Sequence, residues 1–259
     1  MAELAAWVLL AVPLASQDVP PAGDPKPETI QAFERYVRSR LAPLPRDCEG
    51  FLWAGSAEQR RRLLQGKILS QPHYGRGDSP VASGLIHDWV GAIFIPSVGV
   101  EDVLKVVRDY NRHQDFYRPE VVNSWIVSQN GNDYKVHLRL LKQKVVTVVL
   151  DTEHEIRYER LGPTCWQSRS ASTSIREVPA SGKDHGYMWR LNSYWRFHEG
   201  DGGTYLECEV VSLSRTVPAI LARLIDPFLR QLPQQSMAET LRATRVAVEK
   251  GRPRSKSGS

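Results

Sequence analysis

Hydrophobic and polar residues alternate on both sides of a glycine-rich tip near the end of the chain. In residues 189–197 the odd positions are mostly large and apolar, whereas the even positions are mostly polar. The connector is Glu199-Gly200-Asp201-Gly202-Gly203, and an alternating segment over residues 204–212 follows it. Period-two alternation around a glycine-rich turn is typical of a β-hairpin. The sequence therefore predicts an antiparallel hairpin in this region.

A long amphipathic helix is predicted over residues 219–248, directly after the hairpin. Its apolar side chains recur at helical spacing, and Pro233, which has no N–H to donate, predicts a break or kink. A helix that follows the last strand can lie across the concave face of an antiparallel sheet, so we expect a tunnel between helix and sheet. The apolar positions are Ile220, Leu221, Leu224, Ile225, Phe228 and Leu229.

The chain from residue 85 onward predicts an α+β domain built on one curved antiparallel sheet. A strand over residues 85–96 and a helix over residues 100–111 come first, and tight connectors such as Asn130-Gly131-Asn132-Asp133 separate several later strands. Runs of adjacent strands bounded by helices are typical of this fold class. The six later strands are expected at residues 121–129, 134–142, 145–159, 166–178, 188–198 and 204–214.

The strand predicted over residues 145–159 shows the two faces of the sheet most clearly. Its even positions are apolar apart from Thr152, His154 and the hydroxyl of Tyr158, whereas its odd positions become charged toward the end. We expect the even face to meet the core or a cavity and the odd face to meet water.

Two helices are predicted before residue 85, over residues 27–41 and within residues 57–69. They would form a helical extension packed on the back of the sheet. Residues 71–83 read as a loop rich in glycine, proline and serine. This loop contains Arg76-Gly77-Asp78, the tripeptide that integrins bind through its aspartate and arginine. An adhesion motif and a flexible turn stay open as interpretations, and the turn is favoured.

The first 17 residues have the features of a signal peptide. Residues 5–15 are apolar but shorter than the roughly 20 residues that span a membrane, and the proline-rich residues 18–27 read as an exposed spacer. We expect export to the periplasm or cell envelope; a cytoplasmic location follows if the apolar run packs on the domain. The predicted divisions are a signal peptide (1–17), a spacer with the helical extension (18–84), the main domain (85–248) and a basic disordered tail (249–259).

Composition and charge are ordinary for a soluble globular protein. The hydrophobic fraction is 41%, and the net charge of +5 is spread along the chain. No nucleic-acid partner is therefore expected, and the charge reads as a solvated surface or as a weak attraction to anionic membranes. The three cysteines suggest neither a disulfide framework nor a zinc site, although a Cys165–Cys208 pair stays open. Cys208 is expected to be buried on its strand.

Residues 85–248 resemble the START/SRPBCC superfamily, whose helix-grip fold wraps a curved antiparallel sheet around a long C-terminal helix. The resemblance is greatest to exported bacterial members. It implies this fold and an internal cavity for a hydrophobic ligand, and it implies no particular catalytic residue, because the superfamily shares none. The resemblance rests on the order of the elements and on residues 109–113 (DYNRH), 117–121 (YRPEV), 212–215 (SLSR) and 241–248 (LRATRVAV).

The candidate ligand-binding residues are those expected to face the cavity. His154 interrupts an apolar face, so it is either a ligand contact or a core histidine satisfied by a neighbour. The large aromatic side chains would stack on a ligand or simply fill the core. Arg169 would orient an acidic ligand head if it points inward, or be solvated if it points outward. The full set is His154, Tyr158, Trp189, Leu191, Trp195, Leu150, Ile156, Arg169 and Phe228.

No familiar catalytic or metal-binding signature is present. The chain lacks GxSxG, HExxH and P-loop motifs, so we expect no catalytic residue, no cofactor and no metal. His113 follows an apolar helix, and a structural role at the helix end is favoured over that of a general base. Four further histidines are scattered without metal-ligand spacing, at His73, His87, His185 and His198.

Three classes of function stay open from sequence. The favoured one is a non-enzymatic carrier of a hydrophobic small molecule, such as a lipid, a quinone, or a sterol-like or polyketide-like compound. The second is an enzyme of the cyclase/aromatase type that would use His154, Tyr158 and Arg169 in the same cavity. The third is a protein-interaction module with a filled core. We expect a monomer with a hydrophobic small-molecule partner and transient contact with a membrane surface.

Overall fold

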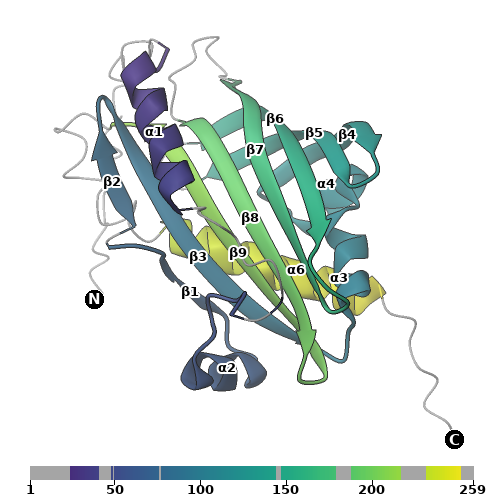
Figure 1. The fold of residues 1–259 in the computed structure, drawn as a ribbon. Helices are drawn as coiled ribbons and strands as arrows, with labels where there is room; N and C mark the ends of the chain where they lie inside the picture. Colours follow the sequence, from purple (N-terminus) through teal and green to yellow (C-terminus); the bar gives the residue numbers. More distant parts are fainter. Residues whose placement is uncertain are drawn as a thin grey trace, which may run out of the picture.

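The body of the molecule is one large antiparallel sheet. A computed structural model describes residues 24–40, 48, 50–75, 77–143, 147–178, 188–216 and 232–251. Within these residues nine strands run in the order β1-β3-β9-β8-β7-β6-β5-β4, with β2 also paired to β3 (Figure 1). The strands are β1 (Leu69–Pro72), β2 (Asp78–Val81), β3 (Gly84–Pro96), β4 (Val121–Asn130), β5 (Asp133–Gln143), β6 (Thr147–Arg160), β7 (Cys165–Glu177), β8 (Met188–Gly200) and β9 (Gly203–Arg215).

Helices lie on both faces of this sheet. Figure 1 shows α1 across one face, beside β2 and β3, and α6 across the other. We call the side of α1 and α2 the outer face, and the side of α3 and α6 the concave face. The helices are α1 (Pro27–Arg40), α2 (Ala57–Leu64), α3 (Val100–Val107), the 3-10 turn η1 (Tyr110–Arg112), α4 (His113–Phe116) and α6 (Leu232–Gly251).

Most predicted elements are confirmed, and two strands were missed. Each of the seven predicted strands is present with ends within two residues of the expected positions. The helix expected over residues 100–111 ends earlier, as α3, and the 3-10 turn η1 and the short α4 follow it. The predicted loop over residues 71–83 contains β2 and part of β1, both paired with β3. The sheet therefore begins before residue 85, where the main domain was expected to start.

The strand β6 confirms the assignment of the two faces. From Val148 to Tyr158 every even residue is buried, whereas the odd residues are half-buried or exposed. This alternation follows from the pleat of a strand, which turns successive side chains to opposite sides. The even residues of β6 face the concave side.

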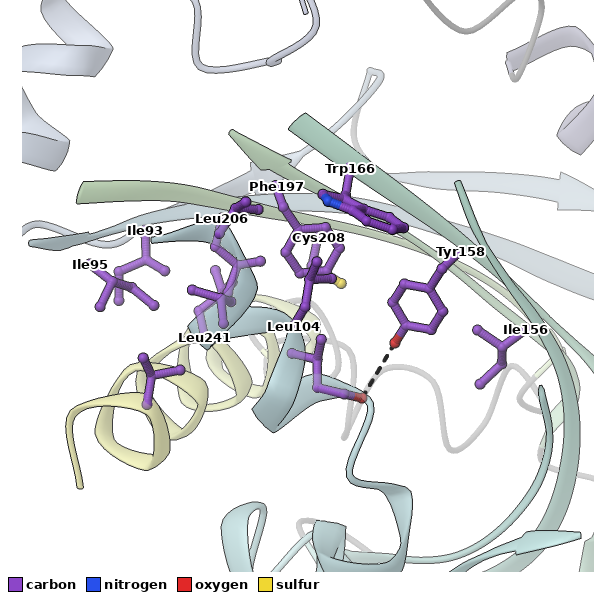
Figure 2. Packing of buried hydrophobic residues seen from close by; sticks show 14 of the residues in the cluster. Ile93, Ile95, Leu104, Ile156, Tyr158, Trp166, Phe197, Leu206, Cys208 and Leu241 are labelled. Carbon is purple, nitrogen blue, oxygen red and sulfur yellow. Dashed lines mark hydrogen bonds between the residues drawn. The ribbon is translucent and has the colours of Figure 1, made fainter. Parts of the chain in front are cut away.

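One half of the concave face is a closely packed core, which we call the packed half. It joins β3, β8 and β9 to α3 and α6 through Ile93, Leu104, Phe197, Leu206 and Leu241, each at most 1% exposed. Figure 2 shows these side chains between the strands and the two helices, with Cys208 among them. Cys208 is buried in this core, as its strand position predicts.

Gly91 allows α6 to lie close to the sheet in the packed half. A Cβ atom at this position would stand 2.6 Å from Cγ of Met237 and 2.9 Å from Cδ1 of Leu241. Real Cβ atoms do not approach other atoms so closely, so a side chain on Gly91 would push α6 away from β3. The close packing of α6 on β3 therefore requires a residue without a side chain at position 91.

The outer face is covered by the helices that the sequence predicts as an extension. α1 packs Phe33 against Ile86, Tyr194 and Leu213, and α2 with the segment before it packs over Phe94 and Tyr205 of the same sheet. Both helices thus bury outer-face apolar positions that water would otherwise reach. The predicted location on the back of the sheet is confirmed.

A disulfide joins Cys48 to Cys165, which corrects the expectation from spacing. The two Cα atoms lie 5.9 Å apart, although 117 residues separate them in the chain. The bond ties the segment before α2 to the start of β7. Cysteine spacing did not reveal it because a disulfide depends on distance in space. The Cys165–Cys208 alternative is wrong, since Cys208 is a free thiol.

The C-terminal helix is confirmed for its second half. α6 begins at Leu232, so Pro233 stands in the first turn of this helix, where a missing N–H costs no intrahelical hydrogen bond. Residues 219–231, with the apolar stripe predicted there, lie outside the described residues. Among the described helices, none is both long and apolar enough to cross a bilayer.

Candidate ligand-binding site

The second half of the concave face is an apolar wall that is less deeply covered, and we call it the open half. Its strands contribute Leu150 from β6, Ile175 from β7, and Met188 and Leu191 from β8. Leu150 is buried, whereas the other three remain half-buried. An apolar surface that keeps partial access to solvent can accept an apolar ligand without displacing packed side chains.

A groove of about 350 Å³ opens at the edge of this wall, between α6 and the segment that runs from α4 to β4. Phe116, Tyr117 and Ala243 line the groove and also belong to the apolar cluster of the open half. Through these three residues the groove adjoins the apolar cluster of the open half. Its volume is at the lower end of small-molecule sites, which span about 300–1,000 Å³.

The rim of the groove is polar and of mixed charge. Arg118 and Glu120 lie on the side that leads to β4, and Glu239, Arg242 and Lys250 lie on α6. An apolar floor below a charged rim is typical of a site that buries the hydrocarbon part of a ligand and leaves its polar group near water. This arrangement orients a ligand that has two chemically different ends.

A short polar belt separates the open half from the packed half, and His154 is at its centre. Its Nε2 lies 3.0 Å from Oγ1 of Thr152, and its Nδ1 lies 3.3 Å from Oγ of Ser170. Burial lowers the pKa of His154 to about 4, so its imidazole is neutral near pH 7. Thr152 in turn donates to the carbonyl of Leu138 at 3.0 Å. Both nitrogens of His154 thus have protein partners.

Tyr158 is in the packed half. Its hydroxyl donates to the carbonyl of Val107 at 3.3 Å and lies 2.7 Å from the hydroxyl of Tyr110; Figure 2 shows the first of these bonds as a dashed line. Burial raises the pKa of Tyr158 well above its ordinary value. The guanidinium of Arg108 lies over the rings of both Tyr158 and Trp166, at 4.4 and 4.5 Å. These contacts fix the Tyr158 ring in place.

His113 has the structural role that the sequence favours. It is buried, and its Nε2 lies 3.1 Å from the carbonyl of Val107, the last residue of α3. Burial lowers the pKa of His113 to about 4, although the hydrogen bond to Val107 acts in the other direction. The side chain therefore ties α4 to the end of α3 as a neutral imidazole.

The structure brings some of the candidate residues together and separates others. Leu150 and Leu191 lie in the open half, and His154 stands at its border. Ile156 and Tyr158 are core residues of the packed half, with Trp195 half-buried against them. A shared cavity around all of them stays a prediction. Phe228 lies outside the described residues.

Trp189 faces the opposite side of the sheet from Leu191 and Trp195, which corrects its assignment. It packs in the outer-face cluster under α1 with Phe33. In the pairing of β8 with β9, Met188 is opposite Ser214 and Arg190 is opposite Leu213, so Trp189 is an extra residue. Such a bulge shifts the alternation by one position. Strict period-two counting therefore put Trp189 on the wrong face.

Arg169 points outward, which is one of the two orientations that the sequence left open. It is exposed on β7, opposite Arg157 of β6 and Tyr194 of β8. Tyr194 belongs to the outer-face cluster under α1. A solvated guanidinium on that face cannot orient a ligand on the concave face.

Sequence reasoning missed the residues that form the groove. Phe116, Tyr117, Ala243 and Val246 lie in two segments that are far apart in the chain. Residues 117–121 and 241–248 carried the family resemblance, and that was the signal that could have pointed to them. Nothing in either segment alone shows that they face each other.

On the outer face, the fold collects a buried group of ionisable side chains. His73 lies 3.1 Å from Glu209 and 3.7 Å from Asp88, measured from Nδ1 to one carboxylate oxygen of each. Burial lowers the pKa of His73, but the two carboxylates more than offset this effect and raise it to about 9. The same three residues could hold a metal ion, because one ligand atom of each lies within 4.8 Å of the others. Histidine spacing in the sequence had suggested no such group.

The tripeptide Arg76-Gly77-Asp78 is partly built into the sheet. Asp78 begins β2, and its carboxylate lies 2.8 Å from Nδ1 of His87. His87 also lies 2.9 Å from the hydroxyl of Ser214 on β9. An aspartate engaged in this way supports the turn interpretation over the adhesion motif. Arg76 lies outside the described residues.

The strand order and the position of α6 decide the fold. An antiparallel sheet in sequential order, with its first long strand β3 beside its last strand β9 and the C-terminal helix across the concave face, is the arrangement that the resemblance predicts. The chain has the helix-grip fold. This fold is the one named above for START/SRPBCC proteins, and solved structures of similar arrangement include members of that group.

Three solved structures illustrate the likeness. The STAR-related lipid transfer protein of Xanthomonas axonopodis is 18% identical, with a TM-score of 0.48 over 67% of this chain and 99% of that chain. The protein TTHA0849 of Thermus thermophilus is 16% identical, with a TM-score of 0.49 over 63% and 98%. Human STARD10 is 9% identical, with a TM-score of 0.44 over 77% and 84%.

These identities carry no function over to this helix-grip chain. No family model matches the sequence, and no curated protein matches it. The case for a ligand therefore has to come from the groove and the open half themselves.

Proposed function

We propose that this helix-grip protein binds a hydrophobic small molecule on its concave face and carries it without transforming it. The observation that supports this function is a groove that adjoins the half-buried apolar wall of the open half through Phe116, Tyr117 and Ala243. Because the packed half already supplies a core, the fold does not need this second apolar surface to be left accessible. The ligand class is a lipid, a quinone, or a sterol-like or polyketide-like compound.

The mixed rim supports a ligand with one polar end. The hydrocarbon part would lie along Leu191, Met188 and Ile175, and its polar group would stay near Arg242 and Lys250 at the mouth of the groove. Burying apolar surface contributes about 25 cal/mol for each Å² removed from water. An elongated apolar chain therefore supplies most of the affinity, and the rim supplies orientation.

The polar groups of the concave face favour carriage over catalysis. His154 and Tyr158, which a cyclase/aromatase-type enzyme would use, are both hydrogen-bonded to protein groups. Arg169, the third member of that set, is exposed on the outer face. A general base needs to reach a substrate proton, and these side chains already use their polar atoms within the fold.

Export to the periplasm or cell envelope remains part of the proposal. The Cys48–Cys165 disulfide supports it, because disulfides persist in oxidising compartments and are rare in the cytosol. The amino-terminal residues that carry the signal-like pattern lie outside the described residues. Amino-terminal sequencing of protein from its native host should start at about residues 15–22, as expected after signal-peptide removal. An intact Met1 on cytoplasmic protein would contradict export.

Fluorescence titration with cis-parinaric acid, an elongated apolar probe, tests the binding function. We expect saturable binding of one probe per chain. Ala243→Phe places a ring in the groove and should weaken binding roughly tenfold, because the ring occupies the space of the hydrocarbon chain. The measurement is the probe's emission as a function of protein concentration.

Ala171→Phe is the matched control, since Ala171 is exposed on β7 and lies outside the groove. It makes the same chemical change and should leave the probe's affinity as it is in the wild type. Equal affinity of both variants, or no saturable binding by the wild type, would reject the concave face as the binding site. The interaction-module hypothesis would then be the favoured one.

A further inference from the structure

The outer face of the sheet contains a buried polar group that the proposed function does not use. It lies between the apolar cluster under α1 and the one under α2. His73 follows β1, Asp88 belongs to β3 and Glu209 to β9. The side chains of Asp88 and Glu209 are only 1% and 2% exposed. Two carboxylates so deeply buried need strong partners, because an uncompensated buried charge is costly.

Each carboxylate has one oxygen held by the protein and one that is not. The hydroxyl of Tyr36 donates to Oδ2 of Asp88 at 2.8 Å, and Nη2 of Arg196 donates to Oε2 of Glu209 at 3.1 Å. Oδ1 of Asp88, Oε1 of Glu209 and Nδ1 of His73 are buried without any hydrogen-bond partner among the described residues. Nδ1 of His73 lies 3.1 Å from Oε1 of Glu209 and 3.7 Å from Oδ1 of Asp88. Both unpartnered carboxylate oxygens therefore lie beside the unpartnered nitrogen of His73.

A neighbouring glutamate shows what the fold does with a buried carboxylate that needs no ligand. Glu207 is completely buried on β9, two residues before Glu209. Its two oxygens accept from the backbone N–H groups of Ala54 and Trp53 at 2.7 and 2.8 Å. The free oxygens of Asp88 and Glu209 therefore do not result from a general shortage of donors on this face.

The orientation of the His73 ring relative to the Glu209 carboxylate fits a shared metal ion better than a shared proton. Nδ1 of His73 and Oε1 of Glu209 are 3.1 Å apart, yet they are not aligned for a hydrogen bond. A proton on Nδ1 lies on the ring's own axis and serves one aligned acceptor. A metal ion on that axis holds several ligands at once, each displaced to the side of the axis.

The two distances from Nδ1 of His73 also fit the bond lengths of a first-row divalent ion. With bonds of about 2.1 Å, the 3.1 Å pair would subtend roughly 95° at the ion and the 3.7 Å pair roughly 125°. These angles lie on either side of the tetrahedral value of about 109°. One imidazole and two carboxylates form a ligand set suited to Zn²⁺ or a similar ion.

We propose that His73, Asp88 and Glu209 bind a divalent transition-metal ion of the zinc type on the outer face of the sheet. Tyr36 and Arg196 orient the two carboxylates by holding their second oxygens. The ion joins the segment after β1 to two central strands, and through Tyr36 it includes α1. Its role is structural, and it is independent of ligand binding on the concave face.

Titration of the full chain with Zn²⁺ tests the site. The protein is first treated with a chelator and dialysed, and binding is followed by calorimetry and by the thermal midpoint. We expect one ion per chain and a rise of about 5 °C or more at saturation, because an ion bound only by the folded state stabilises that state. A wild-type protein that binds no Zn²⁺ would overturn the proposal, and the group would then be an ion pair of protonated His73.

Asp88→Asn and Glu209→Gln keep the shape of each ligand but remove its charge. Each should weaken Zn²⁺ binding by at least about tenfold. Asp78→Asn is the matched control, because Asp78 lies in the same region and pairs with His87 instead. It should leave Zn²⁺ affinity unchanged. Equal affinity of Glu209→Gln and the wild type would also overturn the proposal.

A measurement on the wild type keeps the test decisive if a ligand variant fails to fold. X-ray absorption of the Zn²⁺-loaded protein should show imidazole nitrogen and oxygen ligands and no sulfur. Tyr36→Phe, which removes the hydrogen bond to Asp88 and keeps the ring, should fold and bind Zn²⁺ several-fold more weakly. A thiolate ligand in the absorption spectrum would place the ion elsewhere and reject this site.

Discussion

The two halves of the concave face belong to the same sheet and show the same alternation of side chains, but they are covered differently. In the packed half, α3 and α6 bury Leu206 and Phe197 completely. In the open half, Met188, Ile175 and Leu191 face the same side of the sheet and stay half-buried. The pattern within each strand therefore decides which side a residue faces, and the helices decide whether that side becomes core or a surface available to a ligand.

This difference divides stability from binding. Fully buried side chains of the packed half contribute most to the free energy of folding, because their removal leaves a cavity in a close-packed interior. Half-buried side chains of the open half contribute less and can be covered by a ligand instead. Changes that affect one half and leave the other as it is can test this division.

Leucine truncation should give the largest contrast between the halves. Leu206 is completely buried on β9, and Leu191 is half-buried on the adjacent strand β8. Leu206→Ala should reduce the free energy of unfolding by about 2–5 kcal/mol, and Leu191→Ala by about 1 kcal/mol. Urea denaturation monitored by circular dichroism measures both. Equal losses would show that the open half is packed as tightly as the other.

Acid should destabilise the protein through His154, at the border of the two halves. Its pKa is about 4 in the folded state, against an unfolded value near 6.5. As the pH falls from about 6.5 to 4, the unfolded state binds a proton that the folded state does not, so stability decreases over this window. At pH 4 the loss should be on the order of 3 kcal/mol. Urea denaturation at pH 7 and pH 4 measures it.

His154→Gln separates this contribution from that of His113. Burial lowers the pKa of His113 to about 4 as well. The His154→Gln variant should therefore still lose, between pH 7 and pH 4, the part of the unfolding free energy that is due to His113. His113→Gln is the matched variant, and it should still lose the part of the unfolding free energy that is due to His154. If both variants lose as much stability between pH 7 and pH 4 as the wild type, neither histidine is buried in its neutral form.

Adding one methyl group at Gly91 should disturb the packed half alone. The new Cβ atom would lie 2.6 Å from Met237 on α6, so the helix or the strand has to move. Gly91→Ala should lower the free energy of unfolding by about 1–3 kcal/mol, as is typical of overpacking. At Gly200, where no atom lies within 4 Å of an added Cβ, the same substitution should change stability little. A thermal melt of both variants makes the comparison.

The elements of the fold were predictable because their signals are local. The alternation in β6 and β9 and the helical spacing in residues 27–41 depend on neighbours a few residues away. β1 and β2 escaped notice because each has only four residues, too few to show a period. Trp189 was assigned to the wrong face because a bulge depends on the pairing of two strands.

The residues that form the candidate sites could mostly not be predicted from local sequence patterns. Residues 117 and 243, which face each other across the groove, belong to different segments of the chain. Cys48 and Cys165 are 117 residues apart. The candidate set from strand faces nevertheless included Leu150 and Leu191, which lie in the open half, because facing direction is a local property.

The sequence by itself determined where the seven longer strands and most helices lie, which side most strand residues face, and that a helix follows the last strand. The physical reason is that backbone geometry repeats over two or four residues. Only the tertiary structure decided that α6 covers one half of the concave face closely at Gly91, and that His73, Asp88 and Glu209 meet on the outer face. Those contacts depend on strand pairing and helix docking between residues distant in the chain, and no local repeat records them.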